Sequence, residues 1–195
     1  MSSIESGNYN YLLKHYYSSN RNARKTYGRA TQSNEQLISA DSNALKKVAT
    51  GLKQLEYTSD NGVPIYNNIK AFIDTYNNLA DSSAGSKDAK MLRYSKQLKK
   101  DIKDMKDELE KIGIKVNSYG KLKLDKVKLM STAPEKVAAI FSADNEFTST
   151  ISARSTKMLR KAKELMSSGT SNRTNSLPVT PSTGAPVTSS FDVIG

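Results

Sequence analysis

The chain has 195 residues, of which 36% are apolar and 25% are charged, and its formal net charge is +11. It contains no cysteine and one histidine, His15, which excludes disulfides, thiolate zinc sites, cysteine nucleophiles and metal sites with several histidines. No run of about 18 apolar residues occurs, so we expect no membrane-spanning helix. The first residues lack a basic start and a long apolar stretch, so we also expect no cleaved secretory signal.

Composition divides the chain into three parts. Residues 1–34 are polar and rich in tyrosine, and at most a short helix with Tyr9, Leu12 and Tyr16 on one face is expected there. Residues 35–166 carry the periodic apolar patterns of a folded region. Residues 167–195 hold 12 Ser/Thr and three of the five prolines, which predicts a disordered tail.

Two helices are predicted first in the folded region. Asn34 suits an N-cap, and apolar residues step by three and four from Leu45 to Leu55, which predicts a helix over residues 35–57. The turn signal of residues 61–62 and Pro64 then predict a second helix over residues 64–80. The loop DSSAGS follows, with Ser86 as a candidate cap.

The third predicted helix, over residues 87–112, has the clearest pattern. Five apolar residues form a heptad seam (a stripe of heptad-spaced side chains), and Gly113 stands where a C-terminal glycine cap belongs. Lysines and acids cover the other face, including the i,i+4 pairs Lys103–Asp107 and Asp107–Lys111. The seam is a surface for a partner or a part of the core, and its short length favours the core. Its members are Leu98, Ile102, Met105, Leu109 and Ile112.

The apolar period then changes from helical to alternating, which predicts a β-hairpin over about residues 114–124. Asn117 and Gly120 tolerate the backbone of its turn, and Asp125 suits the cap of a short helix after it. Pro134 opens a helix over residues 134–142, and a last helix is predicted over residues 145–166. The fold class is therefore mainly α, an antiparallel helical bundle with a small hairpin.

The core is predicted from these apolar faces. Its members are Leu45, Val48, Leu52, Ile69, Phe72, Ile73, Tyr76, Leu98, Ile102, Met105, Leu109, Ile112, Leu122, Leu124, Val137, Ile140, Phe141, Ile151 and Met158.

No pattern in the sequence indicates catalysis. Acid pairs such as Asp101 and Asp104 lie on a lysine-rich helix face, where a solvated surface is the plainer interpretation. No phosphate-binding glycine motif occurs, and we expect no cofactor, no metal and no small-molecule substrate. The basic N-terminal segment offers a weak nucleic-acid site, carried by Arg21, Arg24, Lys25 and Arg29.

Two phrases in the middle of the chain resemble a known family. FIDTYNNL starts at Phe72, and a longer phrase runs from Ile112 through IGIKVNSYGKLKLD to PEKVAAIF, ending at Phe141. Over about residues 65–145 they resemble the C-terminal part of the bacterial flagellar filament-capping proteins, also called hook-associated cap proteins. The longer phrase is fairly specific because it encodes helix, cap, hairpin, cap and helix in one order. The matching residues are Phe72, Ile73, Tyr76, Asn77, Leu79, Ile112, Gly113, Ile114, Gly120, Lys121, Leu122, Leu124, Asp125, Leu129, Pro134, Glu135, Val137, Ile140 and Phe141.

The resemblance implies a non-enzymatic assembly function and no active site. Capping proteins sit as an oligomer at the filament tip and help flagellin subunits to add, after export through the flagellar type III apparatus without a cleaved signal. The expected partners are flagellin, other flagellar axial proteins or further copies of the chain, and the expected location is the flagellum. The chain looks like a small stand-alone relative without the family's long N-terminal helical region. The alternatives are a cytoplasmic adaptor or export partner, and a weak nucleic-acid binder.

Overall fold

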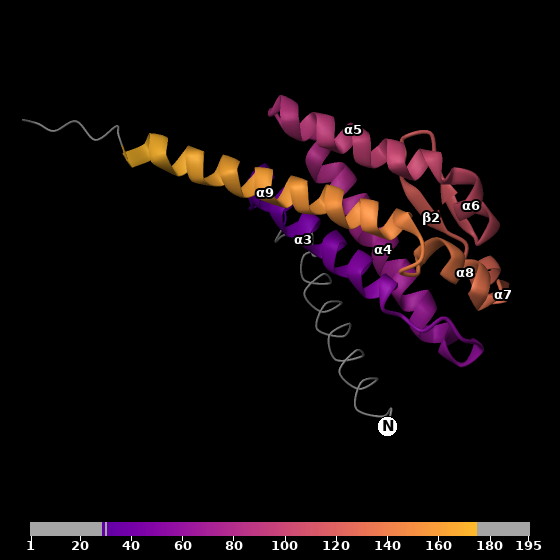
Figure 1. Ribbon diagram of the computed structural model, residues 1–195. Helices are drawn as coiled ribbons and strands as arrows, with labels where there is room; N and C mark the ends of the chain where they lie inside the picture. The colour runs from indigo at the N-terminus through magenta and orange to yellow at the C-terminus, as the bar shows by residue number, and fades with distance from the viewer. Residues whose placement is uncertain (1–28, 30, 175–195) are drawn as a thin grey trace, which may run out of the picture.

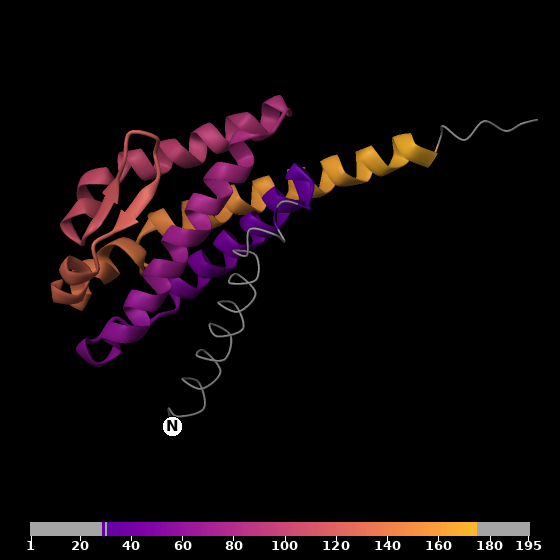
Figure 2. The same cartoon turned by 180° about the vertical axis from the view of Figure 1, so that it is seen from behind.

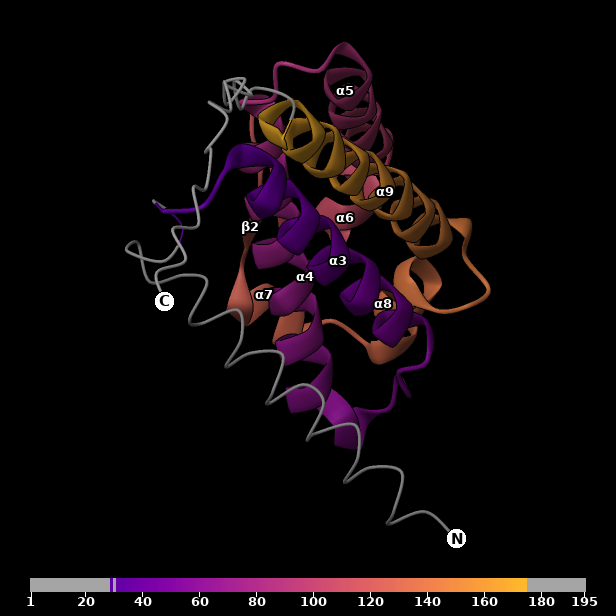
Figure 3. The ribbon, with the colours of Figure 1, turned by 90° about the vertical axis from the view of Figure 1, so that its left-hand side faces the viewer.

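Three long helices form the body of the molecule. The computed structural model describes residue 29 and residues 31–174, so the expected short helix near residues 9–17 and the tail beyond residue 174 lie outside the described residues (Figure 1). The long helices are α3 (Asn34–Lys53), α4 (Gly62–Ala84) and α9 (Glu146–Thr174). α3 packs against both α4 and α9, and its contact with α9 is the more extensive (Figure 3). The prediction of a mainly helical bundle with a small hairpin is confirmed.

The ends of α3 differ from the prediction. Ser33, not Asn34, is the N-cap: its side chain accepts a hydrogen bond from Gln36 N, and the Gln36 side chain accepts one from Ser33 N. The helix stops at Lys53 rather than at residue 57, because the chain turns there. After the turn, the Tyr57 hydroxyl donates a hydrogen bond of 2.8 Å to the Leu52 carbonyl near the end of the helix. A 3₁₀ turn, η1 (Ser59–Asn61), then leads into α4.

α4 begins two residues before Pro64 and continues four residues beyond the predicted end at residue 80. The extra turn is helical because its small side chains are buried against the next helix, where Ser83 Oγ hydrogen-bonds Ser95 Oγ at 2.8 Å. Residues expected to form a loop are therefore part of the helix. The following helix, α5 (Ala89–Asp104), is capped by Asp88 rather than by Ser86, since the Asp88 side chain accepts from Met91 N at 2.7 Å.

The prediction of a single helix over residues 87–112 is wrong, because the helix is interrupted at Met105. There the backbone N–H donates to the carbonyl of Ile102 at 3.2 Å, and the chain restarts as α6 (Lys106–Lys111). The break also changes the surface ion pairs, because the pairs expected for Asp107 are not formed among the described residues. Lys111 binds Glu108 instead, at 2.6 Å.

Short elements complete the fold. The strands β1 (Ile114–Val116) and β2 (Leu122–Leu124) pair antiparallel, with Lys115 opposite Lys123. They are followed by α7 (Lys126–Ser131) and α8 (Pro134–Phe141). Viewed from behind, the hairpin faces the reader in front of α5 and α6 (Figure 2).

α9 continues eight residues beyond the predicted end at residue 166, which corrects the predicted start of the tail. Ser167 and Ser168 fit the helix because both hydroxyls donate to the Glu164 carbonyl at 2.9 Å. A polar composition therefore did not end the helix. The last turns of α9 project beyond the other helices (Figure 1).

The core lies between α3, α4 and α9 and extends under the hairpin. Phe72, Phe141 and Phe147 meet edge to face, with ring centroids 5.3–6.0 Å apart, and join α4, α8 and α9. The predicted core residues are buried except Met105 and Leu124, which are partly buried. Large buried side chains that the prediction omitted are Ile38, Ile65, Leu79, Met91, Ile114, Leu129 and Phe147.

Candidate functional site

The hairpin and its caps form the most constrained part of the described chain. Gly113 has φ +90° and Gly120 has φ +76°, and no other described residue has a positive φ. Gly113 also lies against its neighbours, because a Cβ built on it would stand 3.0 Å from the Asp125 carbonyl oxygen. Its own carbonyl accepts from Asp125 N at 2.8 Å, and the Asp125 carboxylate caps α7 by accepting from Lys128 N at 3.0 Å. These contacts fix where the hairpin starts and ends.

The turn of the hairpin is held from within by Asn117. Its side-chain oxygen accepts from Tyr119 N at 3.0 Å and from Lys121 N at 2.9 Å, while its carbonyl accepts from Gly120 N at 2.9 Å. The backbone groups of the turn are therefore paired locally. The Tyr119 side chain is left in solvent, with 79% of its surface exposed.

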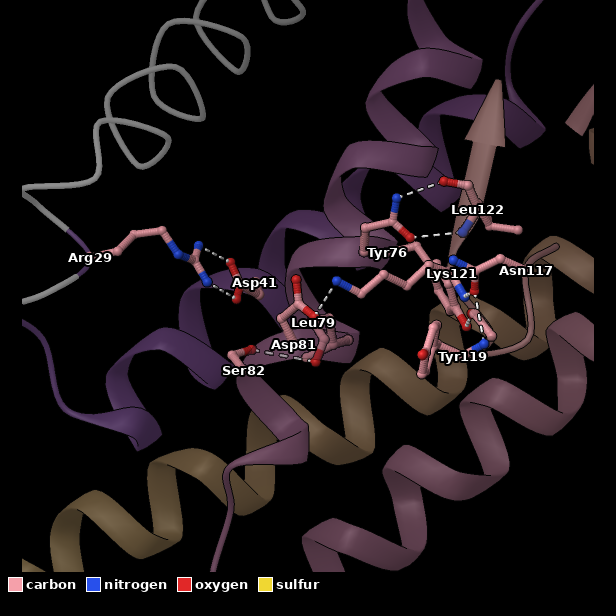
Figure 4. A network of polar contacts seen from close by, with 12 residues as sticks. Arg29, Asp41, Tyr76, Leu79, Asp81, Ser82, Asn117, Tyr119, Lys121 and Leu122 are labelled. Carbon is pink, nitrogen blue, oxygen red and sulfur yellow. Dashed lines mark hydrogen bonds and ion pairs between the residues drawn. The ribbon is translucent and has the colours of Figure 1, made fainter. Parts of the chain in front are cut away.

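Two adjacent residues of α4 hold the hairpin from below. The buried Tyr76 hydroxyl donates to the Gly120 carbonyl at 2.6 Å. The Asn77 amide donates to the Leu122 carbonyl at 2.8 Å and accepts from Leu122 N at 2.9 Å (Figure 4). Asn77 thus pairs with β2 as the backbone of a third strand would. Burial raises the pKa of Tyr76 well above its ordinary value, which keeps the hydroxyl protonated as a donor.

A row of ion pairs continues this network toward the start of α3. Lys121 on the hairpin binds Asp81 of α4 at 2.7 Å, and Arg29 binds the buried carboxylate of Asp41 through two hydrogen bonds of 2.8 and 2.7 Å (Figure 4). The hydrogen bonds that Arg29 donates to the Asp41 carboxylate raise the pKa of Arg29. Arg29 was a candidate for binding nucleic acid, but its guanidinium is occupied by Asp41. The other three basic candidates lie outside the described residues.

The structure places the heptad seam in the core. Leu98, Ile102, Leu109 and Ile112 are at most 1% exposed, and Met105, at the break between α5 and α6, is partly buried. In this conformation the seam therefore packs within the chain and offers no surface to a partner.

α5 is held against α9 by charged contacts that the i,i+4 pattern did not predict. Arg154 Nε lies 2.7 Å from one oxygen of Asp101, and a second guanidinium nitrogen lies 3.2 Å from the other oxygen. Gln97 accepts from the same guanidinium at 3.0 Å. Lys161 lies 3.4 Å from Asp88, whose pKa is lowered mainly by the hydrogen bond from Met91 N. These pairs lie 53 or more residues apart in sequence, so no local pattern reveals them.

The described residues include no group of three or more His, Cys, Asp or Glu side chains that could hold a metal ion. Two open grooves between α3 and α9 are lined mainly by small and polar side chains, such as Thr50, Ser152 and Thr156. None of the described helices is long and apolar enough to cross a membrane.

Comparisons with known proteins found no match among family models, curated proteins or solved structures.

Proposed function

We propose that the protein is a non-enzymatic assembly protein related to the flagellar filament cap, which acts through protein–protein contacts. One observation carries the proposal. The two phrases on which the resemblance rests are in direct contact, because Tyr76 and Asn77 of the first bind Gly120 and Leu122 of the second. Residues 44 and 45 positions apart thus form one unit, in which each phrase requires the other. This supports treating the resemblance as one structural motif rather than as two short coincidences.

The roles of the matched residues agree with an assembly function. Gly113, Gly120 and Asp125 shape the hairpin and cap helices, and the matched apolar residues fill the core. Such a unit can present a rigid surface to other proteins, and the resemblance suggests flagellin, another flagellar axial protein or a second copy as that partner.

The proposal is tested by locating the protein in the cell that encodes it. We expect it in the sheared filament fraction or the medium, and we expect its deletion to reduce motility. An Asn77→Ala variant should fail to restore motility, because β2 loses the two side-chain hydrogen bonds that join it to α4 at Leu122. Asn78→Ala is the matched control, since its side chain, the next along α4, makes no hydrogen bond within the described structure.

Three results would contradict the proposal. The protein found only in the cytoplasm, with motility unchanged by deletion, would favour an adaptor or export partner, as would a pull-down of soluble cytoplasmic proteins. Retention on DNA or RNA that falls steeply with salt would favour a nucleic-acid binder.

A further inference from the structure

The hairpin and α7 carry a concentration of positive charge, of which Lys115 and Lys123 have no ion-pair partner among the described residues and Lys126 lies over the Tyr66 ring, 5.3 Å from its centroid. Residues 114–128 include five lysines and one acid. Lys121 is paired with Asp81, and Lys128 donates to the Glu110 carbonyl. Lys115 and Lys123 stand directly opposite each other across the two strands, both exposed, and neither forms an ion pair with any described residue. Like charges in directly opposite positions destabilise a hairpin, so this pair has a cost that nothing in the described chain offsets.

Exposed apolar side chains follow these lysines in the chain, on the helix that begins directly after β2. Among the described residues, the large apolar side chains that are exposed include Val127 at 80%, Val63 at 62% and Met130 at 46%. Val127 and Met130 are three residues apart on α7 and so share a face of that helix. The Met130 methyl group lies 3.9 Å from the position of a Cβ on Gly62, so the same patch reaches the start of α4 next to Val63. Figure 1 shows α7 at one end of the molecule.

We infer that this surface docks an acidic, amphipathic helix of a partner protein. The surface, called here the α7 face, consists of Lys115, Lys123, Lys126, Val127 and Met130. Carboxylates of the partner would bind the lysines, and its apolar side chains would cover Val127 and Met130. The inference deepens the proposed function, on which it rests, by naming the chemistry of the partner.

β2 is not open to an added strand at Leu122, and a helix fits the length of the α7 face. Asn77 already occupies the outward N–H and C=O of Leu122, so an added strand cannot pair with β2 at that position. Lys123 and Val127 have Cα atoms at most about 14 Å apart along an extended chain. A helix of three turns, about 16 Å long, spans that distance with one face. A lipid surface fits less well, because the α7 face has only two exposed apolar side chains: Tyr66, over which Lys126 lies, is partly buried, and the exposed Tyr119 belongs to the hairpin turn.

Fluorescence anisotropy with the full chain tests the inference. The probe is a labelled peptide of about 18 residues, long enough to form a helix, with leucine at i, i+3, i+4 and i+7 and glutamate elsewhere. We expect binding at low ionic strength and none for a matched peptide with lysine in place of glutamate. The double variant K115E/K123E should weaken binding at least about tenfold. V127S/M130S should also weaken it, with the helical circular dichroism unchanged because both side chains are exposed.

The matched control changes the net charge by the same amount at a distant place on the surface. K90E/K157E alters two exposed lysines of α5 and α9 that have no ion-pair partner in the described structure, and it should bind the peptide within about twofold of the unchanged chain. The inference would be overturned if K90E/K157E lost as much peptide binding as K115E/K123E, or if the acidic peptide did not bind the unchanged chain. Tighter binding to phosphatidylglycerol vesicles or duplex DNA, abolished by K115E/K123E, would overturn it in favour of a membrane or a nucleic acid. Peptide binding by a protein absent from the filament would leave the α7 face intact and contradict only the flagellar role.

Discussion

Replacing Gly113 with alanine should destabilise the protein for two separable reasons. The backbone of Gly113 has φ +90°, a conformation that costs an L-residue roughly 1–2 kcal/mol. The new Cβ would also stand 3.0 Å from the Asp125 carbonyl oxygen and 3.1 Å from both Leu129 N and Lys128 Cβ. Two of these three neighbours are backbone or cap atoms that hold α7 in place, so relieving the overlap should cost a further 1–3 kcal/mol, roughly as for overpacking. The sum is about 2–5 kcal/mol.

Two other glycines separate these costs. Gly120→Ala shares the positive φ, +76°, but its Cβ would meet only the Lys99 side chain at 3.7–3.8 Å, so we expect a loss of about 1–2 kcal/mol. Gly62 has a helical backbone and an open position, so Gly62→Ala should stabilise by about 0.4–1 kcal/mol. Urea unfolding followed by circular dichroism measures all three. If Gly113→Ala costs no more than Gly120→Ala, the close approach between Gly113 and α7 has no energetic weight and the reasoning is wrong.

Three further predictions concern the long-range contacts. Because the pKa of Tyr76 is raised in the folded state, the unfolded chain alone loses this proton above pH about 10, and stability should fall there by about 1.4 kcal/mol per pH unit from this group. Tyr76→Phe lacks that component, so its stability deficit should shrink between pH about 9 and 11 in urea titrations; a constant deficit contradicts the assignment. Asn77→Ala should cost about 1–3 kcal/mol and speed hydrogen exchange at the Leu122 amide, whereas unchanged protection would show that the two side-chain bonds do not hold β2. A double-mutant cycle on Arg154 and Asp101 should give a coupling of about 1–2 kcal/mol, and a value near zero would mark the contact as a solvent-screened pair.

The features whose conformation depends on one or two neighbouring residues were predicted most accurately from the sequence. Gly120 lies in the turn of the hairpin, Gly113 directly before the hairpin and Asp125 at the cap of α7, as predicted, and the apolar stripe from Leu45 to Leu52 is buried along α3. The cap of α3 was also readable, because Ser33 and Gln36 have the spacing of a capping box, although Asn34 was predicted instead.

Features that depend on distant residues could not be predicted in this way. The heptad pattern runs without interruption through Met105, yet the chain turns there so that α6 can approach β1. Asn77 lies at the margin of the apolar face of α4, and its role exists only because Leu122, 45 residues later, comes beside it. The contact of Arg154 with Asp101 likewise required the packing of α5 on α9. In each case the cause is tertiary, and a window of neighbouring residues contains no trace of it.

The pairing of α3 with α9 has a consequence for the order in which the chain folds during synthesis. α3 ends at Lys53 and α9 begins at Glu146, so 93 positions separate the two helices that make the most extensive contact. At about 5–20 residues per second, a ribosome needs roughly 5–20 s to cover that interval. Even after α4 has been made, the apolar stripe of α3 has α4 on one side and lacks α9 on the other. The nascent chain therefore stays accessible to chaperones until α9 has been made, and this part of the core closes only then.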